Sequence, residues 1–271
     1  MSSSAHKLGR QVWLTISPLL PQTNDGPSQP PRSWADEGLS IFLELGVELT
    51  GDVDPQTGLI INVTTIDEKV RQFAIPAINK KISENFKQGK RIDLAETIRL
   101  LQLAWETLAD KFNGAILNKL TLSTNPFRKI SISREDKKMI YLSEKFEFAS
   151  THKLWNNSFN EELNFKIFGK CANPAGHGHN YTAEIIVKIP ADRSDLNLGW
   201  FGEIIEEHFI KLVDHKNLNV DIPHFTKIVP TVENIAAFGW QKLLDKFGAA
   251  KLHCVTIWET NRTYCSYYGD D

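Results

Sequence analysis

Two histidines and a cysteine lie close together in the segment KCANPAGHGHNY, residues 170–181. His177 and His179 are two residues apart at the start of an expected strand, and side chains at positions i and i+2 of a strand point to the same face. Two imidazoles on one face can share a metal ion, and catalytic zinc sites typically combine three protein ligands with one open position. The pattern therefore predicts part of a metal site; the alternative is a pair of surface histidines in a glycine-rich turn.

A third metal ligand must come from elsewhere in the chain, and His152 is the natural candidate. It ends the segment FEFASTH, which belongs to a stretch with the alternating apolar residues of a strand. If this strand pairs with the one that carries His177 and His179, all three imidazoles lie on one patch.

Cys171 stands in the same glycine-rich, polar segment. It could be a fourth ligand or a base, because a thiolate beside a metal and a lysine has a lowered pKa and titrates near neutrality. The alternative is a small buried apolar side chain, which the turn-forming surroundings disfavour. For Cys254 and Cys265, which lie on expected strands, the apolar interpretation is preferred.

Two further segments carry groups that could serve the same site. In LVDHKNLN, Asp214 stands beside His215 just after an expected helix, and a carboxylate that orients an imidazole makes a general acid–base unit. Glu259 ends the otherwise apolar strand segment TIWETN, where a carboxylate could hold a ring that carries N–H donors. The alternatives are a chance Asp-His pair and a solvated strand end.

The elements that would position these residues follow from the spacing of the apolar residues. Segments 139–151 and 181–189 alternate apolar and polar residues, as half-buried antiparallel strands do. Residues 201–213 carry apolar residues at helical spacing. A second helix is expected to begin after Thr231 as its N-cap and to end at Gly248.

The chain also repeats itself at a fixed separation. The segment LAWETLADKF (103–112) resembles FGWQKLLDKF (238–247), and Trp105 and Trp240 within them are 135 residues apart. The strand-like segments LTLSTN and VTIWET that follow keep the same separation. Two copies of one unit explain this order better than a coincidence between two amphipathic helices.

Each copy reads as two strands, a helix, a second helix and two further strands. The sequence therefore predicts an α+β chain of two tandem units, residues 1–136 and 137–271. In the first unit the second helix begins at Asp93, with Glu96 three residues later in a capping-box pattern. The proline-rich segment 24–36 resembles a linker, but the repeat places it between the first two strands of the first unit.

The first unit serves as an internal control for the candidate site, because every residue with a chemical role lies in the second unit. After His6 the first unit contains no histidine, and it contains no cysteine. Residues that roughly match His152, the two later histidines and Glu259 are Pro18, Leu39, Ile41 and Thr124. Residues required for folding would be needed in both copies, so their restriction to one copy indicates a functional site.

Five motifs occur in the order FEFASTH, CANPAGHGHNY, DHKNLN, PTVENIA and WET. Together they resemble the 6-pyruvoyltetrahydropterin synthase family over about residues 140–266. The resemblance implies a T-fold, in which a four-stranded antiparallel sheet carries two helices on one face. It also implies a homo-oligomer whose sheets form a barrel, with active sites between T-fold units.

The resemblance implies roles for ten residues. The zinc ligands would be His152, His177 and His179, and the proton-transfer groups would be Cys171, Asp214 and His215. The residues that bind the pterin would be Glu259, Thr260, Thr231 and Glu233. Cys171 would be the thiolate that abstracts a proton, and Asp214 with His215 would form a second proton-transfer pair from a neighbouring unit. Glu259 would anchor the pterin through its ring nitrogens, helped by Thr260.

The implied reaction is the elimination of triphosphate from 7,8-dihydroneopterin triphosphate, which gives 6-pyruvoyltetrahydropterin. Five residues separate Cys171 from His177, which is similar to the pyruvoyl-forming enzymes; 6-carboxytetrahydropterin synthases of the queuosine route typically have a shorter gap. That synthase activity and a folate-type cleavage of the pterin side chain remain alternatives. A non-catalytic pterin- or metal-binding protein is disfavoured, because all the proton-transfer groups are present.

The composition excludes several other classes of function. Of 271 residues, 31 are basic and 33 acidic, so no charge excess indicates a nucleic acid or an anionic membrane as partner. No apolar run approaches the roughly 20 residues that span a bilayer, and no secretory signal is recognisable. We therefore expect a cytoplasmic enzyme, in which the first unit takes the place of a second subunit and lacks zinc.

Overall fold

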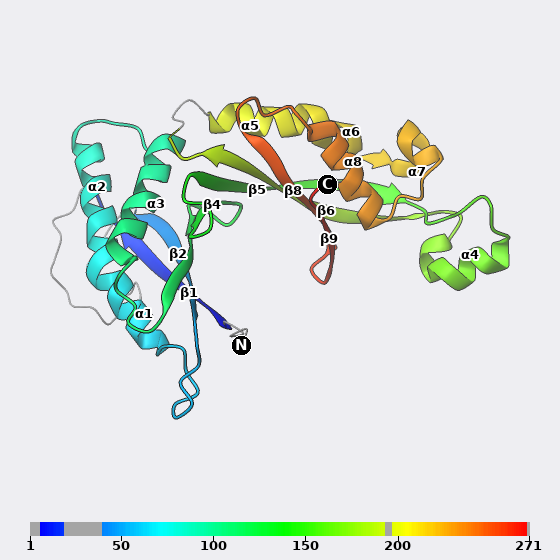
Figure 1. Cartoon of the computed structure of the whole chain (residues 1–271). Helices are drawn as coiled ribbons and strands as arrows, with labels where there is room; N and C mark the ends of the chain where they lie inside the picture. Colours follow the sequence, from blue (N-terminus) through cyan, green and yellow to red (C-terminus); the bar gives the residue numbers. More distant parts are fainter. Residues whose placement is uncertain (1–5, 19–39, 193–196, 270–271) are drawn as a thin grey trace. The chain divides into compact units, whose positions relative to one another are not determined.

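The computed structural model describes residues 6–18, 40–192 and 197–269 (Figure 1). The fold is α+β, with antiparallel strands and helices in both halves. Two compact units divide the chain: Met1–Leu142 with Pro190–Asn197, and Ser143–Ile189 with Leu198–Asp271. They are called unit 1 and unit 2 below. The expected linker 24–36 and residue Leu39 lie outside the described residues.

Unit 1 contains four antiparallel strands that are neighbours in chain order: β1 (His6–Ile16), β2 (Ile41–Gly51), β3 (Ile116–Ser123) and β4 (Arg128–Ser133). Alternate residues of β1 and β2 are buried, because successive side chains of a strand point to opposite faces. Val12 and Leu14 of β1 and Leu45 and Val47 of β2 belong to this buried set. One face of the sheet therefore forms the core of unit 1.

The helices of unit 1 are α1 (Val63–Lys69), η1 (Val70–Ala74), α2 (Ile75–Lys87) and α3 (Leu94–Leu108). The segment η1 is a π-helical turn that joins α1 to α2. Asp93 caps α3 by accepting a hydrogen bond from the Glu96 backbone N–H at 2.9 Å, which confirms the predicted helix start. The apolar stripe of α3, which includes Ile98 and Leu101, is buried, and α3 contacts β3 and β4.

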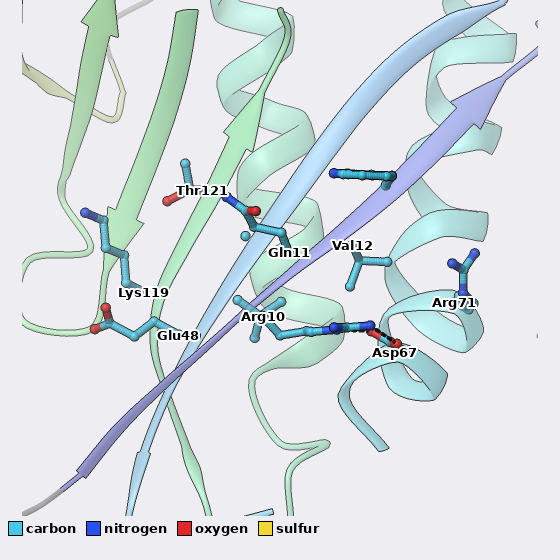
Figure 2. Close-up of a pocket in the computed structure, with 12 residues that line it drawn as sticks. Arg10, Gln11, Val12, Glu48, Asp67, Arg71, Lys119 and Thr121 are labelled. Carbon is cyan, nitrogen blue, oxygen red and sulfur yellow. Dashed lines mark hydrogen bonds and ion pairs between the residues drawn. The ribbon is translucent and has the colours of Figure 1, made fainter. Parts of the chain in front are cut away.

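A concavity of about 790 Å³ lies in unit 1 and is lined by β1, β2, β3 and the α1–η1 segment (Figure 2). Arg10 of β1 donates to both carboxylate oxygens of Asp67 on α1, at 2.9 and 2.7 Å. Figure 2 shows Lys119 and Thr121 of β3 on the side of the concavity that lies away from Asp67. The described residues that line it include none of the predicted site residues.

Unit 2 is built on β5 (Met139–His152), β6 (His177–Pro190), β8 (Lys251–Thr260) and β9 (Thr263–Tyr267). The first four residues of β5 and the last residue of β6 belong to unit 1. These strands are neighbours in that order, and β8 pairs antiparallel with both β6 and β9. The short β7 (Lys216–Asn217) lies parallel to the end of β5, with Ser150 opposite Lys216. This register places the segment after Val213 beside the strand that ends at His152.

The main helices of unit 2 are α5 (Leu198–Ile205), η3 (Glu206–Ile210), α6 (Lys211–Val213) and α8 (Val232–Leu243). As predicted, Thr231 is the N-cap of α8. The predicted end of this helix at Gly248 was wrong: Leu244 already has an extended ψ of 134°, and Asp245 has a positive φ of 59°. Two consecutive non-helical residues end the helix before the glycine is reached.

Short helical segments occupy the connections of unit 2: α4 (Glu161–Phe168), η2 (Gly169–Ala172), α7 (Leu218–Asp221) and η4 (Pro223–Thr226). The segment between β5 and the histidines of β6 therefore contains a helix, α4. Asn160 caps it by accepting from the Leu163 backbone N–H at 2.9 Å. Two glutamates occupy its first turn, where their negative charge interacts favourably with the positive end of the helix dipole.

None of the described helices is long and apolar enough to cross a membrane.

Candidate functional site

The three predicted metal ligands meet where β5 ends and β6 begins. One ligand atom from each of His152, His177 and His179 can be chosen so that all three lie within 4.8 Å of one another. The Nε2 atoms of His152 and His177 are 3.1 Å apart. The alternation of β6 places His177 and His179 on one face, and the neighbouring β5 supplies the third imidazole.

Two glycines allow the backbone of this motif to approach β5 closely. Gly176 has a φ of +70°, and a Cβ there would lie 2.9 Å from the carbonyl oxygen of His152. A Cβ on Gly178 would meet Thr151 Cγ2 at 3.3 Å and the Ser150 carbonyl oxygen at 3.4 Å. The glycine preceding each histidine is therefore part of the geometry that brings the imidazoles together.

The orientation of His152 is fixed by a buried backbone contact. Its Nδ1 lies 2.8 Å from the carbonyl oxygen of Pro230, and because a carbonyl only accepts, Nδ1 carries the hydrogen. His152 is 1% exposed, and this burial lowers the pKa of His152 and keeps the ring neutral. The Nε2 atom of His152 therefore presents a lone pair toward the other histidines.

The donor set fits a metal cation. His177 Nδ1 and His179 Nε2 are buried atoms without a hydrogen-bond partner among the described residues, although buried polar atoms normally have one. His152 Nε2 has no hydrogen to donate, so the 3.1 Å separation from His177 Nε2 is explained either by a hydrogen on His177 Nε2 or by a shared cation. Three neutral imidazoles form the type of ligand set that zinc prefers.

Glu259, at the end of β8, lies against this cluster. Its Oε1 is 3.5 Å from His152 Nε2 and 3.6 Å from His179 Nε2. The pKa values of Cys171 and Tyr181 are raised mainly by burial and secondly by the negative charge of Glu259. The carboxylate therefore acts electrostatically on the histidines, the thiol and the phenol of one site.

Cys171 lies on η2, where its carbonyl oxygen accepts from the Leu154 backbone N–H at 2.9 Å. In the metal-free chain, burial, and then the charge of Glu259, raise the pKa of the Cys171 thiol. The expected lowering of this pKa concerns a thiolate beside a bound metal and stays a prediction. Lys170, the lysine next to it, is exposed, so water screens its charge. In the metal-free chain Cys171 is therefore a thiol.

Asp214 and His215 form the hydrogen-bonded pair that their adjacency suggested. His215 Nδ1 donates to Asp214 Oδ2 at 2.7 Å, and the Ala149 backbone N–H donates to the other carboxylate oxygen at 2.9 Å. Both hydrogen bonds lower the pKa of Asp214, and the bond from Ala149 has the larger effect. The backbone of His215 has a positive φ of 53°, and its side chain is 83% exposed, so the imidazole faces solvent.

The three remaining predicted residues are not joined to the histidines by any hydrogen bond or ion pair within the described ranges. Thr231 follows Pro230 and accepts from the Asn234 backbone N–H at 3.4 Å. Glu233 is exposed in the first turn of α8. Thr260 is exposed beside Glu259, and its hydroxyl accepts from the Arg262 backbone N–H at 3.2 Å.

Three residues around the site had not been assigned a role from the sequence. The hydroxyl of fully buried Tyr181 lies 3.4 Å from His152 Nδ1, and its position two residues after His179 was a usable signal. Asn219 accepts from the Lys153 backbone N–H at 2.7 Å and donates to its carbonyl at 2.9 Å, which fixes the chain just after His152. The Pro230 carbonyl left no such signal, because any residue has one.

Comparisons with known proteins identify relatives of the second half of the chain. The family model described as 6-pyruvoyl tetrahydropterin synthase matches residues 141–270. The human 6-pyruvoyl tetrahydrobiopterin synthase is 36% identical over 132 residues, which cover 48% of this chain and 91% of the relative. The protein of that name from Drosophila melanogaster is 38% identical over 133 residues, covering 48% of this chain and 79% of the relative.

A solved structure, that of the Caenorhabditis elegans 6-pyruvoyl tetrahydropterin synthase, is 28% identical with a TM-score of 0.46, and covers 49% of this chain and 96% of that one. The sequence matches to the curated relatives span most of each relative and fall on the half of the chain that holds the histidines. The chain belongs to the 6-pyruvoyl tetrahydropterin synthase family.

Proposed function

We propose that the chain is a zinc-dependent pterin synthase that eliminates triphosphate from 7,8-dihydroneopterin triphosphate to give 6-pyruvoyltetrahydropterin. Membership of the family makes it an enzyme, a carbon–oxygen lyase that acts on phosphates. The observation that carries the proposal is the convergence of three histidines on one point beside a carboxylate. An elimination of this type needs a polarised side-chain oxygen, a base and a fixed ring, and one cluster supplies groups for all three.

His152, His177 and His179 would hold the zinc ion. When bound, zinc supplies a Lewis acid that polarises oxygens of the pterin side chain and makes the adjacent C–H more acidic. Cys171 takes the proton as a thiolate, a form favoured when positive charge at the histidines offsets the negative charge of Glu259. The raised pKa of Cys171 thus applies to the metal-free chain and not to the zinc-bound enzyme.

The Asp214–His215 pair would carry the second proton transfer. Asp214 accepts from Nδ1 of His215, so the pair leaves Nε2 free to exchange a proton with a substrate. Because the imidazole faces solvent, we propose that it acts on a pterin held by a neighbouring unit in a homo-oligomer. Each active site would then lie between T-fold units.

Four residues would bind the pterin: Glu259, Thr260, Thr231 and Glu233. Glu259 would accept hydrogen bonds from the ring N–H groups, as a partly exposed carboxylate at the edge of the metal cluster can do. Thr231 starts the helix that Pro230 precedes, which places the proposed pterin pocket next to the backbone that orients His152.

We further propose that units 1 and 2 are tandem T-fold units, with residues 1–136 as a copy that has no metal ligands and 137–271 as the zinc-binding copy. Support comes from the same order of elements in both: two main strands, a long helix, a second helix and two strands. In both units the first long helix contains a π-helical turn, at Val70–Ala74 and at Glu206–Ile210. Unit 1 would occupy the place of a second subunit in the oligomer.

The test is the release of triphosphate from 7,8-dihydroneopterin triphosphate by the purified, zinc-loaded chain, with the pterin product identified by mass spectrometry. Formation of 6-pyruvoyltetrahydropterin supports the proposal. A 6-carboxytetrahydropterin would instead identify the queuosine-route activity, and cleavage of the side chain would identify the folate-type activity. If pterin binds and nothing is released, the chain is a pterin-binding protein and the proposed reaction is wrong.

A further inference from the structure

The Asp214–His215 pair is held in a backbone conformation that needs support. His215 has a positive φ of 53°, and the left-handed region is unfavourable for a residue with a side chain. Such conformations persist only where the surrounding structure over-determines them. Because the His215 side chain is 83% exposed, its own packing supplies little of that support. The support must therefore come from hydrogen bonds to the backbone around it.

The end of β5 supplies this support on one side of His215. The His215 backbone N–H donates to the carbonyl oxygen of Ala149 at 2.6 Å, and the Ala149 backbone N–H donates to Asp214 Oδ1 at 2.9 Å. The Ser150 hydroxyl donates to the carbonyl oxygen of Val213. These contacts fix the chain up to His215, after which β7 runs parallel to β5.

Asn219, two residues after β7, fixes the chain on the other side of His215. Its Oδ1 accepts from the Lys153 backbone N–H at 2.7 Å, and its Nδ2 donates to the Lys153 carbonyl oxygen at 2.9 Å. This contact, called the Asn219 clamp below, extends a parallel pairing of only two residues, and parallel pairing is the weaker kind. It needs a side chain with both a donor and an acceptor, which a carboxylate is not.

The same hydrogen bonds enclose a predicted metal ligand. His152 lies between Ala149 and Lys153 in the chain, and both of these residues are bonded to the segment 214–219. A displacement of that segment therefore pulls on the strand end that carries His152. The backbone that sets the direction of His215 and the backbone that carries the metal ligand form one hydrogen-bonded body.

We propose that Asn219 is a positioning residue for the second proton transfer. Its clamp keeps His215 in the left-handed conformation and couples the direction of the His215 imidazole to the metal site. Asn219 acts through the backbone of Lys153 and transfers no proton itself. The proposal rests on the proposed function, from which it takes the role of His215 and the metal at His152.

The first test needs no turnover. Aromatic ¹H–¹³C spectra of the full-length chain report the ring C–H groups of His215, whose signals are identified by their absence in H215A. In N219A these signals should move, because the ring takes another direction. Saturating Zn²⁺ should shift the His215 signals of the unaltered, initially metal-free chain and should leave those of N219A unchanged.

Two further variants make this test specific. N219D keeps an acceptor for the Lys153 N–H but places a carboxylate against the Lys153 carbonyl oxygen; it covers the case that N219A does not fold, and it should give the same changes. N118A is the matched control, because Asn118 of unit 1 is also half-buried and donates from its amide to a residue distant in the chain, Glu48. Its His215 signals should equal those of the unaltered chain.

Turnover gives a second readout. N219A should lower kcat roughly 10- to 100-fold, the effect of a misplaced catalytic group, and should leave KM nearly unchanged. H215A should lower kcat by about 10²- to 10⁴-fold. Because Asn219 acts through His215, the double variant N219A/H215A should have the kcat of H215A alone.

The outcomes separate this proposal from the proposed function. Unchanged His215 signals in N219A and N219D overturn the Asn219 clamp, and so does a Zn²⁺-induced shift that persists in both variants. Losses of kcat that multiply in the double variant overturn an action through His215. If no form of the chain releases triphosphate while the spectra change as expected, the clamp is supported and the proposed reaction is wrong.

Discussion

Replacing Gly176 with alanine separates backbone strain from the assembly of the metal site. Gly176 has a φ of +70°, and its Cβ would lie 2.9 Å from the carbonyl oxygen of His152. The left-handed conformation costs an L-residue roughly 1–2 kcal/mol, and forcing an extra carbon into a packed region typically adds about 1–3 kcal/mol. G176A should therefore lower the free energy of unfolding by about 2–5 kcal/mol.

The chain offers a closely matched control. Gly58 has a φ of +72°, and a Cβ there would meet nothing within 4 Å. G58A should carry the conformational cost alone, roughly 1–2 kcal/mol, and should not affect metal binding. The difference between the two variants isolates the contact with the His152 carbonyl.

The assay has two parts, urea unfolding followed by circular dichroism and competitive titration of Zn²⁺ with a chromophoric chelator. The clash has to be relieved by moving either the His152 backbone or the start of β6, which carries His177. Either movement separates the two ligands, so G176A should weaken Zn²⁺ binding by at least about tenfold, the lower end of the effect of disturbing the support of a metal site. Equal Zn²⁺ affinity for G176A and G58A would refute the claim that this glycine sets the ligand geometry.

Three further predictions follow from the same site. C171A should abolish turnover while Zn²⁺ stays bound, as measured by metal analysis after dialysis; loss of Zn²⁺ would make Cys171 a ligand instead of a base. Metal-free protein should be more stable above pH 6.5 and lose stability as the pH falls through the lowered folded-state pKa of His152, because the unfolded chain binds that proton more readily. Urea unfolding between pH 8 and pH 5 should show a smaller slope for H152N than for the unaltered chain, because His179 and His224, whose pKa values burial also lowers, remain in the variant. Metal analysis should give one zinc per chain, since the first 136 residues contain no cysteine and only His6 as a histidine; two zinc ions per chain would exclude the proposed division of roles.

The sequence was most informative where the chemistry depended on local periodicity. The spacing of His177 and His179 on a strand required a common face, and the end of the preceding strand was the nearest place for His152. The N-caps Asp93 and Thr231 were likewise visible, because a side chain that accepts from a backbone N–H three residues later is a local feature. These predictions needed only the geometry of a strand and of the first turn of a helix.

The features that the sequence did not reveal depend on groups distant in the chain. Pro230 orients His152 through a carbonyl 78 residues away, and no residue type marks such a contact. The pKa of Cys171 follows burial and the charge of Glu259, not the charge of its neighbour in sequence. The direction of the His215 side chain depends on a positive φ at a non-glycine residue, which sequence preference does not predict.

The contact between Pro230 and His152 also links the two halves of the proposed chemistry. Pro230 immediately precedes Thr231, so the residue that fixes the metal ligand is continuous with the N-terminus of α8, where the pterin pocket is proposed. The hydroxyl of Tyr181 lies 3.4 Å from the same Nδ1, and the Tyr181 ring stacks on Phe148 at a centroid distance of 4.9 Å. A displacement of α8 would therefore turn the His152 ring against a rigid aromatic neighbour. If the proposed metal site and the proposed pterin pocket are both present, a substitution that shifts the start of α8 should reduce zinc affinity and pterin affinity in parallel.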